Sequence, residues 1–220
     1  MLHPWLTTLS HCPAIAIIRS LRRDWGYQMA ITAIEAGLSC IEITWGERTV
    51  TLDLIQQLRQ EFPQCSIGVG TILRQSHLKD AIAAGCQFAF SPVFDAACLH
   101  HAETSGLPFI PGALTPTEVW TAWQAGAIAV KVFPIKSMGG STYLRCLREA
   151  LGTQVPLIPT GGVSLDNTLD LLTAGAMGVG LSGGLFPRLP DGTPDLVQTQ
   201  TIATQLVAML QEAKGLGSRD

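Results

Sequence analysis

The stretch AIAVKVFP, residues 127–134, combines two properties that seldom occur together. It is almost wholly apolar, as a buried β-strand is, yet it carries a charged side chain, Lys131. Taking an ammonium group out of water is so unfavourable that a buried lysine has a partner or gives up its proton. Lys131 is therefore expected either to reach solvent from the edge of a sheet or to take part in chemistry.

Apolar runs like this one recur along the chain at intervals of roughly 20 to 25 residues, which is the spacing of βα units with short connections. Segments of helical periodicity lie between them, and several end at a glycine, as a helix C-cap does. A last helix is expected over residues 201–213. The expected strands are residues 14–18, 40–44, 65–70, 87–91, 107–110, 128–133, 156–160 and 177–182.

Eight strands that alternate with helices are typical of a (β/α)8 TIM barrel, whereas an open doubly wound sheet usually has about five or six. We therefore expect an α/β fold in which residues 1–220 form one barrel domain. The stretch rich in proline and glycine, FPRLPDGTPD (186–195), lies between the last expected strand and the last helix. It does not separate two cores, so it indicates no domain boundary.

Composition excludes several classes of function. The net charge is −3, and charged residues make up 14% and hydrophobic residues 47% of the chain. The sequence lacks the stripe of basic residues that a nucleic-acid-binding protein carries, so we expect no nucleic-acid partner. The six cysteines form no CxxC pair, which is typical of reduced intracellular thiols and not of a disulfide or zinc scaffold. Neither a signal peptide nor an apolar run of about 18 residues is evident. We expect a soluble cytoplasmic protein without a membrane partner.

Polar side chains follow several of the expected strands at their C-terminal ends, where a barrel of this kind carries its active site. Lys131 and Glu42 lie near the ends of their strands. Arg19 follows the first strand, Thr71 follows the third and Thr160 ends the seventh. We therefore expect these five side chains to gather on one rim of the barrel.

A partly desolvated lysine near the cation Arg19 has a pKa drawn toward neutrality, and its amine can attack a carbonyl carbon to form a Schiff base. A carboxylate on the same rim, Glu42, can then move protons to and from the reacting atoms. Two other interpretations stay open. Lys131 can be an edge lysine that extends to solvent, or it can form a structural buried ion pair with Glu42.

Two glycine-rich segments follow the last two strands: PTGG at 159–162 and SGG at 182–184. These are the places where barrels often bind phosphate through backbone N–H groups, and glycine lets the backbone approach an anion closely. Either segment alone is more often a simple turn, but their joint occurrence favours a phosphorylated substrate.

The chain resembles the family of 2-keto-3-deoxy-6-phosphogluconate (KDPG) aldolases and 4-hydroxy-2-oxoglutarate (KHG) aldolases. The resemblance spans residues 14–186, and the joint presence of its blocks in this order is more specific than any one of them. The blocks are GLSCIEITW (37–45), GVGTIL (68–73), FAFSPVF (88–94), FIPGALTPTE (109–118), KVFP (131–134) and PTGGVS (159–164).

The resemblance implies a class I aldolase in which Lys131 forms the Schiff base and Glu42 is the general acid/base. Such an enzyme cleaves KDPG to pyruvate and glyceraldehyde 3-phosphate, or KHG to pyruvate and glyoxylate. It needs neither a metal nor an organic cofactor. Family members are typically homotrimers, so the resemblance also implies a homotrimer here.

The resemblance also implies a set of substrate-binding residues. Arg19 and Thr71 match positions that bind the substrate, and Pro92 and Phe133 match residues that wall the pocket. The segment beside the sugar and the phosphate is matched by Thr160, Gly161 and Gly162.

Two departures from the family pattern bear on the anion sites. The phosphogluconate branch carries an arginine for the pyruvate carboxylate where this chain has Gly46, so Arg48 or Arg19 is expected to replace it. The serine expected after the last strand aligns with Gly183, which leaves Ser182 beside it as a substitute. Three functions stay open: the KDPG aldolase, an aldolase for KHG, phosphogalactonate or another short 2-keto acid, and a barrel that only binds a phosphorylated metabolite.

Overall fold

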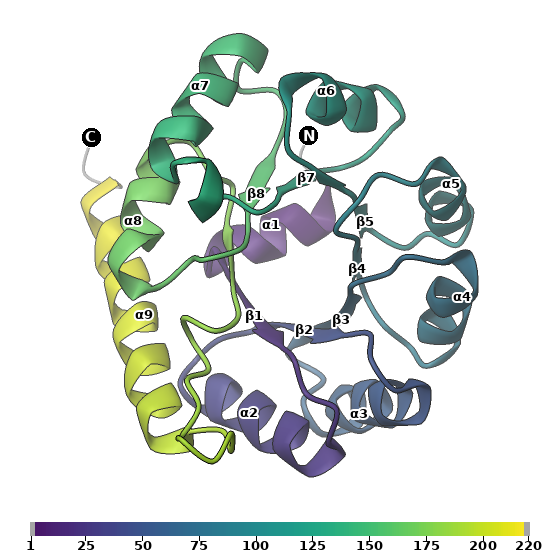
Figure 1. Ribbon diagram of the computed structural model, residues 1–220, viewed down its shortest axis with the longest axis vertical. Coiled ribbons are helices and arrows are strands. Elements are labelled where there is room, and N and C mark those ends of the chain that lie inside the picture. The colour runs from purple at the N-terminus through teal and green to yellow at the C-terminus, as the bar shows by residue number, and fades with distance from the viewer. Residues whose placement is uncertain (1–2, 218–220) are drawn as a thin grey trace.

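The computed structural model describes residues 3–217 as alternating strands and helices (Figure 1). The strands are β1 (Ala14–Ile18), β2 (Cys40–Thr44), β3 (Ser66–Gly70), β4 (Ala89–Phe90), β5 (Phe109–Ile110), β6 (Gly112–Ala113), β7 (Val130–Val132), β8 (Leu157–Pro159) and β9 (Val179–Leu181). The helices are α1 (Pro4–His11), α2 (Arg23–Glu35), α3 (Arg48–Glu61), α4 (Gln75–Ala83), α5 (Ala96–Thr104), α6 (Pro116–Gln124), α7 (Ser141–Leu151), α8 (Leu165–Thr173) and α9 (Leu196–Gly217), with a 3-10 helix, η1 (Lys136–Met138).

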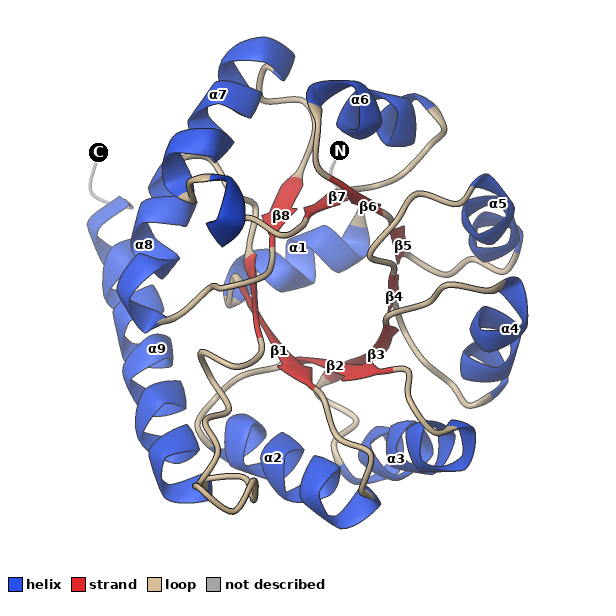
Figure 2. Ribbon diagram, in the orientation of Figure 1, coloured by secondary structure: helices blue, strands red, loops and turns tan. Residues whose placement is uncertain are grey.

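The strands pair in parallel, as expected for an α/β fold. They form two sheets, one with the strand order β5-β4-β3-β2-β1-β9 and the other with the order β6-β7-β8. Figure 2 shows both sheets around a common centre, with helices α2 to α9 on the outside. The C-terminal ends of all the strands therefore lie on the same side of the molecule.

The expectation of one continuous eight-stranded sheet differs from the hydrogen-bonding pattern, which divides the strands between two sheets. The strand expected at 107–110 is observed as β5, and the chain continues beyond Pro111 as β6, which belongs to the second sheet. Proline has no N–H group, so it cannot donate to a strand ladder. On the other side, β8 is joined to β9 through an isolated bridge between Thr160 and Gly180.

The expected bounds of β1 and β2 are confirmed, whereas the later strands are shorter than expected and α9 is longer. Helix α1 was not expected. A helix of eight residues is too short to be stable in isolation, so tertiary packing must stabilise it. Its side chains Trp5, Leu6 and Leu9 are buried in the apolar interior of the strands, beside Phe88 and Phe90.

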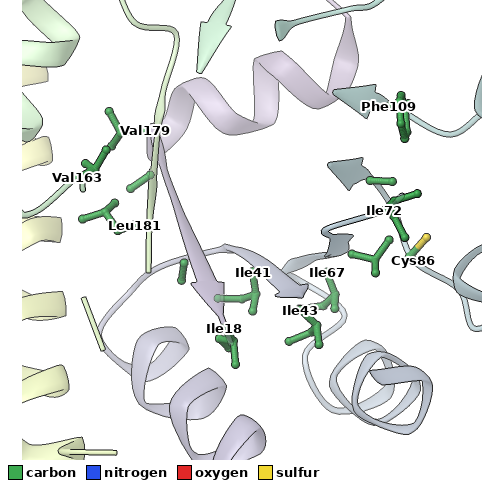
Figure 3. Close-up of a cluster of buried hydrophobic side chains, with 14 of the residues drawn as sticks. Ile18, Ile41, Ile43, Ile67, Ile72, Cys86, Phe109, Val163, Val179 and Leu181 are labelled. Atoms are coloured by element: carbon green, nitrogen blue, oxygen red, sulfur yellow. The ribbon is translucent and has the colours of Figure 1, made fainter. Parts of the chain in front are cut away.

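Alternation of side chains along each strand places the catalytic candidates inside the ring of strands. Ile41 and Ile43 of β2 belong to the large apolar cluster between strands and helices, part of which is drawn in Figure 3. Glu42 lies between them in sequence and therefore points to the opposite face. The same alternation in β7 directs Val130 and Val132 outward and Lys131 inward.

Within residues 3–217, none of the helices combines the length and the apolar character that crossing a membrane requires.

Candidate active site

A cavity of about 480 Å³ opens at the C-terminal ends of the strands. It is formed by inward-facing side chains of β2 and β7 and by the segments that directly follow the other strands. Eleven of the twelve residues expected at the site line it: Arg19, Glu42, Thr71, Pro92, Lys131, Phe133, Thr160, Gly161, Gly162, Ser182 and Gly183.

Arg48, the twelfth residue, does not reach the cavity, so the expectation that it binds substrate needs correction. It is the first residue of α3, and its side chain is 63% exposed. Its Nε and Nη2 atoms donate to the two carboxylate oxygens of Asp80 on α4, at 2.7 and 2.8 Å. This bidentate pair holds the guanidinium on the outer surface, between the two helices.

Three further residues complete the lining: Ile17, Val163 and Gly184. Ile17 is paired in register with Glu42, so strand alternation alone places it on the inner face. Val163 directly follows the PTGG segment, and Gly184 ends the SGG segment. Periodicity within the strands was the signal that could have identified Ile17 in advance.

Lys131 is only 5% exposed, and its Nζ atom lies 5.8 and 5.2 Å from the ring centroids of Phe90 and Phe133. The interpretation of Lys131 as an edge lysine that extends to solvent is therefore wrong. Burial lowers the pKa of Lys131 from its ordinary value. The carboxyl of Glu42 opposes this shift, and the charge of Arg19 adds to it.

Glu42 is 1% exposed, and neither of its carboxyl oxygens has a hydrogen-bond partner among residues 3–217. Burial raises its pKa above the ordinary value, while the cations Lys131 and Arg19 counteract part of that rise. The carboxyl oxygens make no ion pair with Lys131, so the two groups do not satisfy each other as a structural pair does. The pKa shifts of Lys131 and Glu42 therefore both favour the neutral form of the group, and the two groups line the same cavity.

Thr71, directly after β3, has a φ of 61°, a left-handed conformation that a β-branched residue rarely adopts. Such strain occurs mainly where the surrounding structure holds a residue for a functional reason. Thr71 lines the cavity from the strand next to Glu42, so the strained backbone presents its side chain to the site.

The segment after β8 forms the wall of the cavity next to Phe133. Gly161 and Gly162 have φ values of 91° and 79°, which side-chain-bearing residues rarely adopt. A Cβ atom on Gly161 would lie 2.9 Å from the ring of Phe133, so glycine is also needed for space. Asn167 on α8 donates from Nδ2 to the carbonyl of Gly162 at 3.0 Å and thereby fixes this wall.

Within the described residues 3–217, no group of three or more His, Cys, Asp or Glu side chains is arranged to hold a metal ion. The polar groups that line the cavity are an amine, a carboxyl group, a guanidinium, three hydroxyl groups and glycine backbone.

Known proteins resemble this chain over most of its length. Residues 7–188 match the family model described as KDPG and KHG aldolase. The chain is 33% identical over 159 residues to the 2-dehydro-3-deoxy-phosphogluconate aldolase of Treponema pallidum, covering 72% of this chain and 75% of that protein. It is 30% identical over 182 residues to the 2-dehydro-3-deoxy-6-phosphogalactonate aldolase of Escherichia coli, covering 83% and 87%.

A solved structure extends the likeness to three dimensions. The crystal structure of 2-keto-3-deoxy-6-phosphogluconate aldolase from Zymomonas mobilis superposes with a TM-score of 0.81 at 25% identity, covering 92% of this chain and 96% of that one. With a family model that covers most of the chain and relatives at this level of identity, the protein belongs to the KDPG and KHG aldolase family and is an aldolase, that is, a lyase.

Proposed function

We propose that this chain is a class I aldolase that cleaves KDPG to pyruvate and glyceraldehyde 3-phosphate, with Lys131 as the Schiff-base residue and Glu42 as the general acid/base. One observation carries the proposal: an amine and a carboxyl group, both buried, both displaced toward neutrality and not hydrogen-bonded to each other, line one cavity. A neutral amine is the nucleophilic form of lysine, and a protonated carboxyl is an acid available at neutral pH.

The reaction follows from these two groups. The amine of Lys131 adds to the C2 carbonyl carbon, and the resulting carbinolamine loses its hydroxyl as water when Glu42 donates a proton. The carboxylate of Glu42 then takes the proton of the C4 hydroxyl while the C3–C4 bond breaks. The electron pair of that bond moves into an enamine, and the aldehyde leaves.

The second half of the reaction restores both residues. Glu42 returns its proton to C3, which converts the enamine to the imine of pyruvate. Water then adds to the imine carbon, pyruvate is released as the C2–N bond breaks, and the proton set free returns to Glu42. Arg19 supports this cycle because its positive charge favours the neutral amine of Lys131 and the carboxylate of Glu42.

The remaining lining residues are proposed to bind the substrate. Thr71 and Thr160 supply hydroxyl groups near the reacting atoms, and Pro92 and Phe133 form the apolar walls. The backbone of Gly161, Gly162 and Gly183, with Ser182, is proposed to receive the phosphate, because glycine segments permit close approach to an anion.

A second substrate preference has its own observation. Gly46 removes the arginine that the phosphogluconate branch uses, and the relative in Escherichia coli is named for phosphogalactonate. KHG, phosphogalactonate or another short 2-keto acid is therefore the alternative substrate. A barrel that only binds a phosphorylated metabolite is disfavoured, since a ligand-binding site gains nothing from a buried lysine and a buried, unpartnered carboxyl.

We further propose that residues 1–220 form one closed (β/α)8 barrel, that three copies assemble into a homotrimer, and that the protein acts in the cytoplasm on small molecules without a metal or organic cofactor. The arrangement of strands around one centre in Figure 2 supports the closed barrel. The remaining statements rest on the family resemblance, and the sequence shows neither an apolar run long enough to cross a membrane nor a basic stripe.

Borohydride trapping tests the chemistry. The protein is incubated with pyruvate and reduced, and the modified peptide is identified by mass spectrometry. We expect the adduct on Lys131, its loss in Lys131→Met, and its retention in Lys79→Met, a matched control on the exposed surface of α4. Absence of an adduct in a folded protein would falsify the Schiff-base mechanism, and turnover of KDPG against KHG then decides the substrate.

A further inference from the structure

Two glycines in the wall of the catalytic cavity have backbone N–H groups that a ligand can use. Gly162 follows β8 and Gly183 follows β9, and both residues line the cavity. Within residues 3–217, the N–H groups of these two glycines donate to no backbone carbonyl. Backbone N–H groups without such a partner are ready donors to the oxygens of an anion.

Neutral N–H groups do not balance the charge of a phosphate monoester, which carries roughly two negative charges at neutral pH. Among the described residues that line the cavity, the cations are Arg19 and Lys131. Both act at the reacting carbonyl, since Lys131 is proposed to bond to it and Arg19 lowers the pKa of Lys131. Gly183 adds no side chain, although a Cβ atom there would meet nothing within 4 Å. The lining therefore brings no positive charge of its own to the phosphate end of the cavity.

Lys136 lies directly beside this end of the cavity. It is the first residue of η1, and its backbone N–H donates to the carbonyl of Gly161 at 3.1 Å. A Cβ atom added to Gly162 would overlap the Cβ of Lys136 and would lie 2.6 Å from its Cδ and 3.0 Å from its Cγ. The aliphatic part of the side chain therefore runs across Gly162. The ammonium group is only two bonds beyond Cδ, so it can reach an anion bound at the N–H of Gly162.

The charge of Lys136 is available to a ligand. The residue is exposed, and among residues 3–217 its ammonium group forms no ion pair with a carboxylate. Lys131, five residues earlier, is buried by contrast. A lysine ammonium binds phosphate as a mobile point charge on a flexible stem, which suits a residue at the rim of a site.

We propose that Lys136 binds the terminal phosphate of the substrate, with its ammonium group on one phosphate oxygen and the N–H groups of Gly162 and Gly183 on others. The proposal rests on the function proposed above and makes Lys136 a specificity-determining residue for that reaction. It selects 2-keto acids that end in a phosphate over their unphosphorylated counterparts. The phosphate is remote from the carbonyl that joins Lys131, so Lys136 contributes to binding and not to bond cleavage.

The test compares Lys136→Met with Lys79→Met. Methionine keeps most of the stem that covers Gly162 and removes the charge. Lys79 is a matched control because it is exposed on α4, a helix from which no residue lines the cavity. The readouts are KM and kcat for KDPG and for its unphosphorylated counterpart, 2-keto-3-deoxygluconate.

Loss of one charge-assisted hydrogen bond predicts that KM for KDPG rises about tenfold in Lys136→Met, with little change in kcat. KM for 2-keto-3-deoxygluconate should stay the same, and Lys79→Met should change neither value. Lys136→Arg, which keeps the charge, should retain most of the affinity for KDPG. The difference between wild type and Lys136→Met should also shrink as salt is added, because an exposed charge is screened.

A purely structural role of Lys136 gives a different result. If the stem only shields Gly162, Lys136→Met behaves as the wild type does, whereas Lys136→Ala raises KM for both substrates alike. Either result overturns the assignment of Lys136.

The two proposals fail in different ways. Equal KM values for KDPG in wild type and Lys136→Met, with the pyruvate adduct still formed on Lys131, overturn the phosphate contact and leave the aldolase mechanism intact. Absence of the adduct in the wild type overturns the proposed function itself. An adduct without cleavage of KDPG overturns the proposed substrate and the phosphate contact together.

Discussion

The carboxyl group of Glu42 lies directly over the Cα of Gly70 on the neighbouring strand, in the space that a side chain at position 70 would occupy. A Cβ atom added to Gly70 would overlap the Oε1, Cδ and Cγ atoms of Glu42. The register explains the proximity, because β2 and β3 pair Glu42 with Gly68 and Thr44 with Gly70. A glycine on β3 therefore makes room for an acid on β2.

Gly70→Ala is expected to lower kcat by about 100-fold, since displacement of a catalytic group by roughly 1 Å has an effect of that size. The measurement is the steady-state release of pyruvate from substrate. Asp is one methylene shorter than Glu, so Glu42→Asp in the Gly70→Ala background should recover part of the lost rate. If the two positions do not interact, the double variant will be slower than the wild type by the product of the two single-variant factors, which would contradict this prediction.

Arg19 should set the position of the pH–rate profile. Its charge lowers the pKa of both Lys131 and Glu42, so Arg19→Met should raise both and move both limbs of the profile to higher pH. Arg19→Lys, which keeps the charge, should leave the limbs near their wild-type positions. The profile is recorded as the rate of borohydride trapping against pH, and a shift in opposite directions would contradict the electrostatic role.

Glu42→Gln should stabilise the protein at about pH 8. The folded-state pKa of Glu42 is raised above 4.5, so the folded state binds its proton more tightly than the unfolded state does. The stabilising contribution of Glu42 to the free energy of unfolding is fully present below pH 4.5 and is lost as the pH rises through the pKa of Glu42 in the folded state. A neutral amide removes that loss, and we expect a gain of roughly 1–3 kcal/mol in urea unfolding. The gain should vanish near pH 4, and a gain of equal size at both pH values would exclude an ionisation effect.

Asn167→Ala should weaken the binding of phosphorylated substrate more than it slows the chemistry. The variant loses the hydrogen bond that fixes the carbonyl of Gly162 in the cavity wall. We expect KM for KDPG to rise by about tenfold with little change in kcat. Asp166→Ala, the preceding and exposed residue of α8, serves as the control. Equal changes in KM for KDPG and for unphosphorylated KHG would show that Asn167 does not act through phosphate binding.

Arg48→Ala should leave turnover unchanged, because Arg48 is engaged with Asp80 on the outer surface. The test is kcat/KM for pyruvate release, with Arg19→Ala as the variant that lowers it. A marked fall in Arg48→Ala would mean that the guanidinium leaves Asp80 to reach the substrate.

Sequence periodicity could predict the inner face of the strands, since Glu42 and Lys131 each interrupt an apolar run at an inward position. It could not predict the outcome for Arg48, because the competing carboxylate, Asp80, lies 32 residues away on another helix. Strand β6, which follows Pro111, was not expected, because the effect of that proline on the sheet depends on which N–H groups the neighbouring strand requires.

Local sequence pattern also could not predict the contact between Glu42 and Gly70. That contact depends on the register of β2 and β3, which long-range packing decides. Helix α1 was missed for the same reason, because it is stabilised by contacts with Phe88 and Phe90 rather than by its own sequence.

Helix α1 has one more consequence. Trp5 packs on Phe88 and Phe90, so helix α1 closes the ring of strands at their N-terminal ends. Ligands can therefore reach and leave the catalytic cavity only at the C-terminal ends of the strands. Substrate must enter, and both products must depart, through the same opening. Under the proposed reaction, pyruvate stays covalently attached until the aldehyde has left, which makes release strictly sequential. Excess aldehyde should therefore occupy the mouth and delay the departure of pyruvate.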